Sequence, residues 1–432
     1  MARLIVHGGH VVSPVDRLDA ELDILIEDGI LGEIAPRIAS RGDETIAAQG
    51  QIVSPGFVDL HVHLREPGGE ISETVESGLA AAVAGGFTAV CPMPNTQPVN
   101  DRPEPTRALV EKAKAIGLAR IFPIAAVSPA SAGETLTDFF ALKEAGAVAF
   151  SDDGKPVRTA GLMRRALEAA WSLGMAIVDH CEDPSLSAGG CVHEGPTAEH
   201  LGVKGIPASS EDVCVARDLV LAEAAGAHVH IAHLSTARAV EMVRAAKLRG
   251  VRVTCEVTPH HFTLTDEAVA RYGTGAKMNP PLRSAGDVEA VQEGLADGTI
   301  DAIATDHAPH APELKRRPLT EAPFGVIGLE TALPLAVMKF VHTGRISLPR
   351  LISLLSANPA TIIRPTTTAV LGRLQIGAPA DITVFDVDHE WTYVANRGHS
   401  KSCNTPFDGW TLRGAVTATI VGGRVVYRRH QD

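Results

Sequence analysis

Several features are scarce or missing in this sequence of 432 residues, and each absence excludes a class of protein. Aromatic residues make up only 4% of the chain, and 51 acidic residues outnumber 39 basic ones, so no basic field for a nucleic-acid backbone is expected. No apolar run is long enough to span a membrane, and the first residues, MARLIVHGGH, lack the apolar core of a signal peptide. We expect a soluble, cytoplasmic protein that binds neither nucleic acid nor membranes.

Two further signatures are absent. The six cysteines are scattered and form no C-x-x-C pair, so we interpret them as reduced thiols, with Cys181 as a small buried apolar residue. No G-x-G-x-x-G or Walker A motif opens an expected helix, which removes the strongest signature of nucleotide binding.

The two ends of the chain have similar β-type patterns. Short runs such as RLIVHGGHVV and ELDILIEDG lie within residues 1–54, and ADITVFDVD and AVTATIVGGRVVYR lie within 371–432. Chain ends often lie close together, so these segments are predicted to form one small β-sandwich-like domain.

The middle of the chain, residues 55–370, alternates apolar β runs with alanine-rich helical stretches. The eight runs are FVDLHVH near 57, FTAVCPM near 87, RIFPIAA near 120, AVAFS near 147, MAIVDH near 175, HVHIAH near 228, VRVTCEV near 251 and DAIATDH near 301. Eight strand-helix units favour an α/β fold of the (β/α)₈ TIM-barrel type over an open, doubly wound sheet.

Polar residues cluster where the predicted strands end, which is where such barrels carry their active sites. These residues are His61 and His63 after strand one, Asp152 and Asp153 after strand four, His180 after five, His233 after six, and Asp306 and His307 after eight. Imidazole and carboxylate groups are the usual zinc ligands, so a metal site at this rim is predicted.

Strand alternation supports this site, because every second residue shares a face. Asp59, His61, His63 and Arg65 are predicted to face one way, with Val58, Leu60 and Val62 opposite. By the same reasoning His233 continues the inward run of Val229 and Ile231, whereas His228 and His230 are predicted to pack elsewhere or meet solvent. Asp59 is assigned at most a supporting role.

Taken together, these motifs resemble the amidohydrolase superfamily, and within it the bacterial class I dihydroorotases. The likeness spans nearly the whole chain, in DLHVHLREPG, PMPNTQP, FSDDGKPV, VDHCED, IAHLST, KMNPPLR, ATDHAPH and APFGVIGLE. Allantoinases and hydantoinases are related alternatives. Arg65 and the DDG element in place of a strand lysine favour a dihydroorotase.

The resemblance implies a ligand set for two zinc ions. His61 and His63 would bind one ion and His180 and His233 the other, with Asp153 bridging them; Asp306 would complete the first site and act as catalytic base and acid. The implied substrate contacts are His63, Leu64, Arg65, Asn95, Asn279, His310, Phe324 and Gly325.

Strand spacing alone leaves Asp152 and Asp153 open as the bridge, and Lys155 is a less favoured candidate for a carboxylated bridging lysine. The resemblance further implies a homodimer, association with aspartate transcarbamoylase, and a reaction that interconverts dihydroorotate and N-carbamoyl-L-aspartate in pyrimidine biosynthesis. An inactive structural partner of the transcarbamoylase is a different alternative, and metal content would distinguish it.

Overall fold

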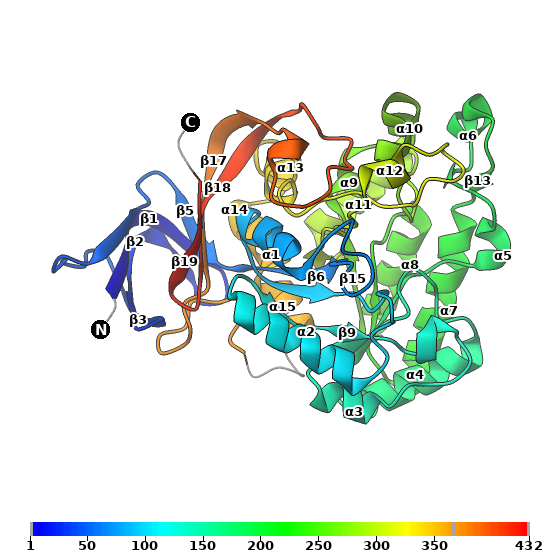
Figure 1. The fold of residues 1–432 in the computed structure, drawn as a ribbon, viewed down its shortest axis with the longest axis horizontal. Helices are drawn as coiled ribbons and strands as arrows, with labels where there is room; N and C mark the ends of the chain where they lie inside the picture. Colours follow the sequence, from blue (N-terminus) through cyan, green and yellow to red (C-terminus); the bar gives the residue numbers. More distant parts are fainter. Residues whose placement is uncertain (1–2, 364–368, 430–432) are drawn as a thin grey trace.

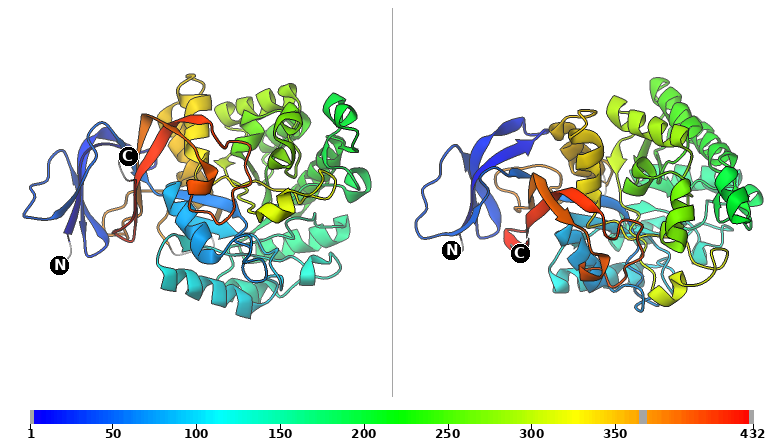
Figure 2. Two further views of the ribbon diagram at one scale, coloured as in Figure 1. Left: turned by 45° about the horizontal axis from the view of Figure 1, so that its top comes forward. Right: turned by 90° about the horizontal axis from the view of Figure 1, so that it is seen from above.

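A computed structural model describes residues 3–363 and 369–429 of the chain. Residues 1–2, 364–368 and 430–432, which the predicted domain ranges include, lie outside the described residues. An elongated sheet lies beside a larger barrel of strands and helices, with both chain ends on the sheet side (Figures 1 and 2).

Parallel strands form the predicted barrel. They are β6 (Phe57–Val62), β7 (Phe87–Pro92), β8 (Arg120–Ile121), β9 (Ile124–Ala125), β10 (Ala149–Phe150), β11 (Ala176–Asp179), β14 (Val229–Ile231), β15 (Val253–Val257) and β16 (Ala302–Ile303). β8 and β9 are two halves of the third position, so eight positions follow one another in chain order. The ring closes where His307, just after β16, forms a parallel bridge with Val62. The (β/α)₈ prediction is confirmed.

Helices cover the outside of this ring (Figure 1). The longer ones are α1 (Val75–Ala84), α2 (Pro103–Ile116), α4 (Ala160–Ser172), α7 (Ser209–Ala225), α8 (Ala237–Leu248), α11 (Ala285–Asp297) and α14 (Leu348–Leu355). Several begin at hydroxyl caps that satisfy free backbone N–H groups, including Thr159 at α4 and Thr236 at α8. The caps fix where each βα loop gives way to its helix.

The terminal segments share a single sheet. Its strands are β1 (Arg3–Ser13), β2 (Leu18–Glu27), β3 (Ile30–Ala35), β4 (Glu44–Ala47), β5 (Ile52–Pro55), β17 (Ile382–Thr392), β18 (Thr411–Val421) and β19 (Arg424–Arg428). β5 pairs with both β1 and β17, and so joins the two ends of the chain. A separate apolar cluster, which includes Val6, Ile24, Val53 and Ile382, stabilises this sheet.

The largest apolar cluster lies between the barrel strands and the outer helices, with Ile177, Val229 and Ile303 among its members. Burial of such side chains stabilises the ring that positions the strand ends. Within the described part of the chain, no helix is both long and apolar enough to cross a bilayer.

Candidate active site

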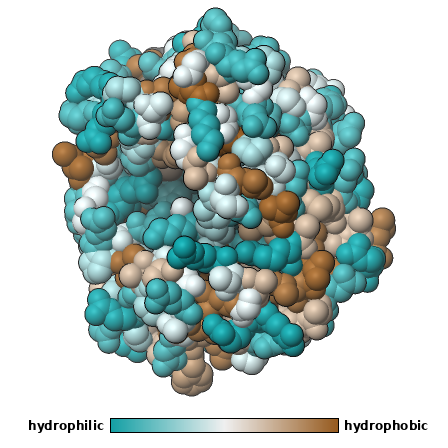
Figure 3. Space-filling model, turned by 90° about the vertical axis from the view of Figure 1, so that its right-hand side faces the viewer, coloured by the Kyte–Doolittle hydropathy of each residue, from teal (hydrophilic) through white to brown (hydrophobic). Residues whose placement is uncertain are grey.

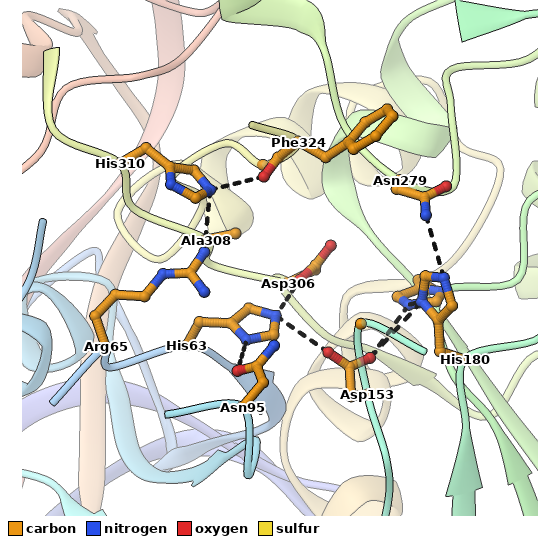
Figure 4. Close-up of a pocket in the computed structure, with 13 residues that line it drawn as sticks. His63, Arg65, Asn95, Asp153, His180, Asn279, Asp306, Ala308, His310 and Phe324 are labelled. Atoms are coloured by element: carbon orange, nitrogen blue, oxygen red, sulfur yellow. Dashed lines mark hydrogen bonds and ion pairs between the residues drawn. The ribbon is translucent and has the colours of Figure 1, made fainter. Parts of the chain in front are cut away.

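A pocket of about 170 Å³ lies at the carboxyl ends of the barrel strands. Its lining consists of His63, Arg65, Asn95, Asp153, Gly154, His180, His233, Asn279, Asp306, Ala308, His310, Phe324 and Gly325 (Figure 4). All predicted site residues except His61 and Leu64 are in this lining. The end of the molecule remote from the sheet is hollowed, and hydrophilic residues line the hollow (Figure 3).

His61 and His63 approach both predicted carboxylates. The Nε2 atom of His63 lies 2.9 Å from Oδ1 of Asp306 and 3.6 Å from Oδ2 of Asp153. The Nε2 atom of His61 lies 3.6 Å from Oδ1 of Asp306 and 3.3 Å from Oδ1 of Asp153. Two imidazoles and two carboxylates therefore surround one small volume.

The regular alternation predicted for this strand is wrong in detail. The pairing of β6 with β7 shifts register between Asp59 and Val62, so the pleat is interrupted before His63. The Asp59 carboxylate stabilises this irregular segment, because it accepts hydrogen bonds from the backbone N–H of His61 at 3.1 Å and of Thr305 at 3.0 Å. Asp59 thus holds the backbone and not an imidazole.

His180 and His233 form the opposite wall of the site. Nδ1 of His180 lies 2.9 Å from Nε2 of His233, and these atoms lie 3.8 Å and 3.7 Å from Oδ1 of Asp153. The predicted inward run to His233 is wrong, since β14 ends at Ile231 and His233 has a left-handed φ of 31°. This strained backbone, and not the strand pleat, turns the imidazole into the site.

Asp153, and not its neighbour, faces the histidines. Asp152 accepts hydrogen bonds from the backbone N–H of Ser128 at 3.0 Å and from its hydroxyl at 2.5 Å. Lys155 donates to the carbonyl oxygen of Ser131 at 3.3 Å, outside the cluster. Of the two open aspartates, only Asp153 lies between both histidine pairs (Figure 4).

The donor atoms of this cluster fit bound cations. Nε2 of His61 and Oδ1 of Asp153 are buried and have no hydrogen-bond partner among the described residues, a costly state unless another group satisfies them. Within this cluster, two groups of side chains bring one donor atom each within 4.8 Å of one another: His61, His63 and Asp306, and His61, Asp153 and His233. Burial alone would raise the pKa of Asp153, but the imidazoles of His61, His233 and His63 outweigh it and hold that pKa well below its ordinary value.

Glu256 on β15 is a candidate functional residue that the sequence patterns missed. Its Oε1 accepts a hydrogen bond from Nδ1 of His61 at 2.9 Å, and its Oε2 lies 3.2 Å from Nε2 of His230. Burial would raise the pKa of Glu256, but His230 and His61 lower it to about 2. His230, which was predicted to pack elsewhere or meet solvent, is therefore buried against Glu256, the residue that binds His61. In the sequence, the glutamate within the apolar run VTCEV was the feature that could have indicated Glu256.

Arg65 brings a positive charge to the pocket. Its Nε donates to the carbonyl oxygen of Pro309 at 3.0 Å, and Nη2 lies 3.2 Å from Nε2 of His310. In the described ranges, no carboxylate oxygen lies within 4.0 Å of this guanidinium. Burial lowers the pKa of Arg65 to about 10, although Asp306, Asp153 and Glu73 oppose the shift. A guanidinium whose contacts are a carbonyl oxygen and an imidazole can still bind an anion by charge-assisted hydrogen bonds.

The two predicted asparagines contact histidines. Oδ1 of Asn95 accepts from Nδ1 of His63 at 2.9 Å, which directs the other ring nitrogen of His63 to the carboxylates. Nδ2 of Asn279 donates to Oε2 of Glu182 at 2.5 Å, and the same oxygen lies 3.0 Å from Nε2 of His180. Glu182, also missed from the sequence, thereby orients His180 as Glu256 orients His61.

The remaining predicted substrate contacts differ in whether their polar groups or side chains are free to face the pocket. Leu64 is buried in the main apolar cluster, so its side chain does not reach the pocket. Nε2 of His310 donates to the carbonyl oxygen of Phe324 at 2.7 Å. The N–H of Gly325 is bonded to the carbonyl oxygen of Lys277 at 3.0 Å, and a Cβ at Gly325 would lie 2.7 Å from that of Ala308. Gly325 therefore shapes the wall, and its N–H is already satisfied.

Comparison with known proteins gives the same assignment as the motifs. Residues 50–239 match the family model described as dihydro-orotase-like. The dihydroorotase of Solibacter usitatus is 50% identical over 431 residues, covering 99% of each chain, and that of Pelotomaculum thermopropionicum is 52% identical over 427 residues, covering 98% of each. The chain belongs to the dihydroorotase family.

Solved structures place this dihydroorotase family member among the amidohydrolase barrels. The L-hydantoinase (dihydropyrimidinase) of Arthrobacter aurescens has a TM-score of 0.89 at 28% identity and covers 100% of this chain and 97% of its own. A D-hydantoinase structure, with a TM-score of 0.83 at 24% identity, shares the fold. The chain is thus a hydrolase of the cyclic-amide type, as the resemblance predicted.

Proposed function

We propose that this chain interconverts (S)-dihydroorotate and N-carbamoyl-L-aspartate. The observation that carries the choice of substrate is Arg65, whose guanidinium lies beside the histidine and aspartate cluster and forms no ion pair with any described residue. Dihydroorotate is a cyclic amide with an exocyclic carboxylate, and a guanidinium binds carboxylates by charge-assisted, directional hydrogen bonds.

Two zinc ions are the proposed cofactors. His61, His63 and Asp306 would hold one ion, His180 and His233 the other, and Asp153 would bridge them. The imidazole and carboxylate donors match zinc. When bound, such ions make water acidic enough to ionise near neutral pH and polarise a carbonyl oxygen.

Asp306 is the proposed proton carrier. Burial alone would raise its pKa, but His61 and His63 lower it below the ordinary value, so the carboxylate is ionised at neutral pH. It can accept a proton from the attacking water as the new C–O bond forms at the ring carbonyl. It then delivers that proton to the ring nitrogen as the C–N bond breaks, and the reverse transfer closes the ring.

The remaining polar groups orient the reactants. Arg65 binds the exocyclic carboxylate, with His310 beside it, while Asn95 fixes the ring of His63. Asn279 lies on the opposite side of the pocket, next to His180 (Figure 4). A ligand anchored at Arg65 would extend across the pocket toward the aspartates.

Ring opening of dihydroorotate, hydantoin and allantoin by the purified, zinc-loaded protein tests this proposal. We expect turnover of dihydroorotate in both directions, with kcat/KM far above that for either other compound. Preference for hydantoin or allantoin would overturn the substrate assignment.

A second candidate function is that of a hydantoinase-type amidase, which the 28% identity and TM-score of 0.89 to the Arthrobacter aurescens enzyme support. A hydantoin ring carries no obligatory exocyclic carboxylate, so it leaves Arg65 unpaired. An inactive partner of aspartate transcarbamoylase is a third alternative, and a purified chain that binds no zinc would favour it.

The finer assignments rest on the same resemblance. We propose a place in pyrimidine biosynthesis, a cytoplasmic location, a homodimer, and association with aspartate transcarbamoylase. Sedimentation of the protein alone and with the transcarbamoylase would test both assemblies.

A further inference from the structure

One edge of the pocket is formed by a segment without regular secondary structure. Residues 316–325, here called the covering segment, follow α12 (Pro312–Lys315) and include the pocket residues Phe324 and Gly325. Its own backbone supplies few bonds, among them the N–H groups of Glu321 and Ala322 to the carbonyl oxygen of Pro318, both at 2.9 Å. Such a segment needs other contacts to keep one conformation.

Lys315 provides two such contacts, to Pro323 and Gly325, and a third hydrogen bond to Lys277, which lies outside the segment. Its ammonium donates to the carbonyl oxygens of Gly325 at 2.9 Å, Pro323 at 3.0 Å and Lys277 at 3.3 Å. An ammonium has three N–H donors, so the set is complete. The residue is only 7% exposed, and in the part of the chain that the structure describes no carboxylate oxygen lies within 4.0 Å of it.

Lys277 holds the other half of the covering segment. Its ammonium donates to the carbonyl oxygens of Leu319 and Ala322, both at 2.6 Å. It also lies 4.4 Å from the centroid of the Phe324 ring, within reach of a cation–π contact. The residue is 3% exposed. Together the lysine pair, Lys277 and Lys315, contacts positions from 319 to 325.

If Lys277 and Lys315 served only to fill space, burying their charges would be unfavourable. Two buried ammonium groups lie near each other, neither forms an ion pair within the described ranges, and burial together with the charge of Lys277 lowers the pKa of Lys315 to about 7. A methionine would fill similar volume without desolvating a charge. What the charges add is a set of directional bonds to main-chain oxygens, which hold a backbone irrespective of its side chains.

We propose that Lys277 and Lys315 are positioning residues that fix the covering segment over the pocket and so set the wall formed by Phe324 and Gly325. The role in substrate binding rests on the proposed function, whereas the role in ordering the segment does not. Neither lysine lines the pocket, so both act through the backbone they hold.

Lys315→Met and Lys277→Met test the proposal. Arg317→Met is the matched control, since Arg317 is exposed on the same segment. Backbone hydrogen exchange of residues 316–325 should accelerate at least about 10-fold in each lysine variant, because a lost charged hydrogen bond weakens closure by that order. The control should exchange like the wild type.

Steady-state kinetics of the variants distinguish a positioning role from a general loss of structure. KM for dihydroorotate should rise about 10-fold in the lysine variants while kcat changes much less, since the reacting groups stay in place. Unchanged exchange in both lysine variants overturns the proposal. If Lys315→Met does not fold, Lys277→Met alone decides in the same way. Faster exchange in a protein whose wild type does not hydrolyse dihydroorotate supports the lysine pair and refutes the proposed function.

Discussion

Nδ1 of His61 donates to Oε1 of Glu256 at 2.9 Å, and neither side chain is exposed. The bond fixes the ring so that Nε2 points at Asp153 and Asp306. A carboxylate behind a ligand histidine also increases its basicity, which strengthens its bond to a cation.

Glu256→Gln keeps the size of the side chain but removes its charge. We expect zinc affinity to fall by roughly 10- to 100-fold, as for other partners of ligand histidines. Competition with a fluorescent chelator measures this. Glu267→Gln, at an exposed position, is the control; equal affinities in both variants would remove the role assigned to Glu256.

Asp306→Asn leaves the shape of the site but removes the proton acceptor. We expect kcat to fall by about 10²- to 10⁴-fold in both directions, the usual contribution of a general acid–base group. Steady-state kinetics at full metal loading measure it, with Asp388→Asn on the exposed part of β17 as the control. A kcat near that of the wild type would contradict the assignment.

Arg65→Met should impair turnover of substrates that carry a carboxylate. Loss of a charge-assisted hydrogen bond of about 1.5–3 kcal/mol predicts a decrease of roughly 10- to 100-fold in kcat/KM for dihydroorotate. An uncharged cyclic amide should lose far less, and the ratio of the two serves as an internal control. Equal losses would mean that Arg65 does not bind the carboxylate.

Removal of metal should affect stability as well as activity. Because the donor cluster assembles only in the fold, free zinc at about 1,000 times its dissociation constant should stabilise the protein by about 4 kcal/mol. Denaturant unfolding before and after chelation measures this. Adding zinc back should restore both stability and activity. Identical unfolding curves before and after chelation would argue against a metal site in this cluster.

Glu73 links α1 to the segment before β18. It is fully buried, and its carboxylate accepts from the backbone N–H of Lys401 at 3.0 Å and lies 3.2 Å from Nε2 of His307. Burial would raise its pKa, but His307 and the hydroxyls of Ser400 and Ser77 outweigh burial and lower it from 4.5.

Because the folded-state pKa is depressed, the stabilising effect of Glu73 is fully present above about pH 4.5 and disappears as the pH falls through the folded-state value. Glu73→Gln should therefore lose about 1–3 kcal/mol at pH 7 and little in strong acid. Unfolding across this pH range checks it, with exposed Glu76→Gln as the control. A pH-independent difference would contradict this explanation.

The sequence by itself determined the order of strands and helices and the polar residues at the strand ends. Local hydrophobic patterns specify elements, and the eight predicted runs all lie in the barrel. The motifs also indicated the family by their resemblance to it, because the residues that carry this resemblance lie within short segments.

Only the tertiary structure decided how these residues meet. His61 and Glu256 are 195 positions apart, and no local pattern relates them. The orientations of His61, His63 and His233 were predicted from the two-residue repeat of a strand. The register shift in β6 and the left-handed backbone of His233 interrupt that repeat. Strand spacing alone left Asp152 and Asp153 open, and in the fold Asp152 accepts hydrogen bonds from Ser128 whereas Asp153, which the resemblance implied, lies beside the histidines. The contacts of Lys277 and Lys315 with the covering segment were likewise not predictable from the sequence. The two lysines bind main-chain carbonyl oxygens, which every residue has, so no sequence pattern marks them.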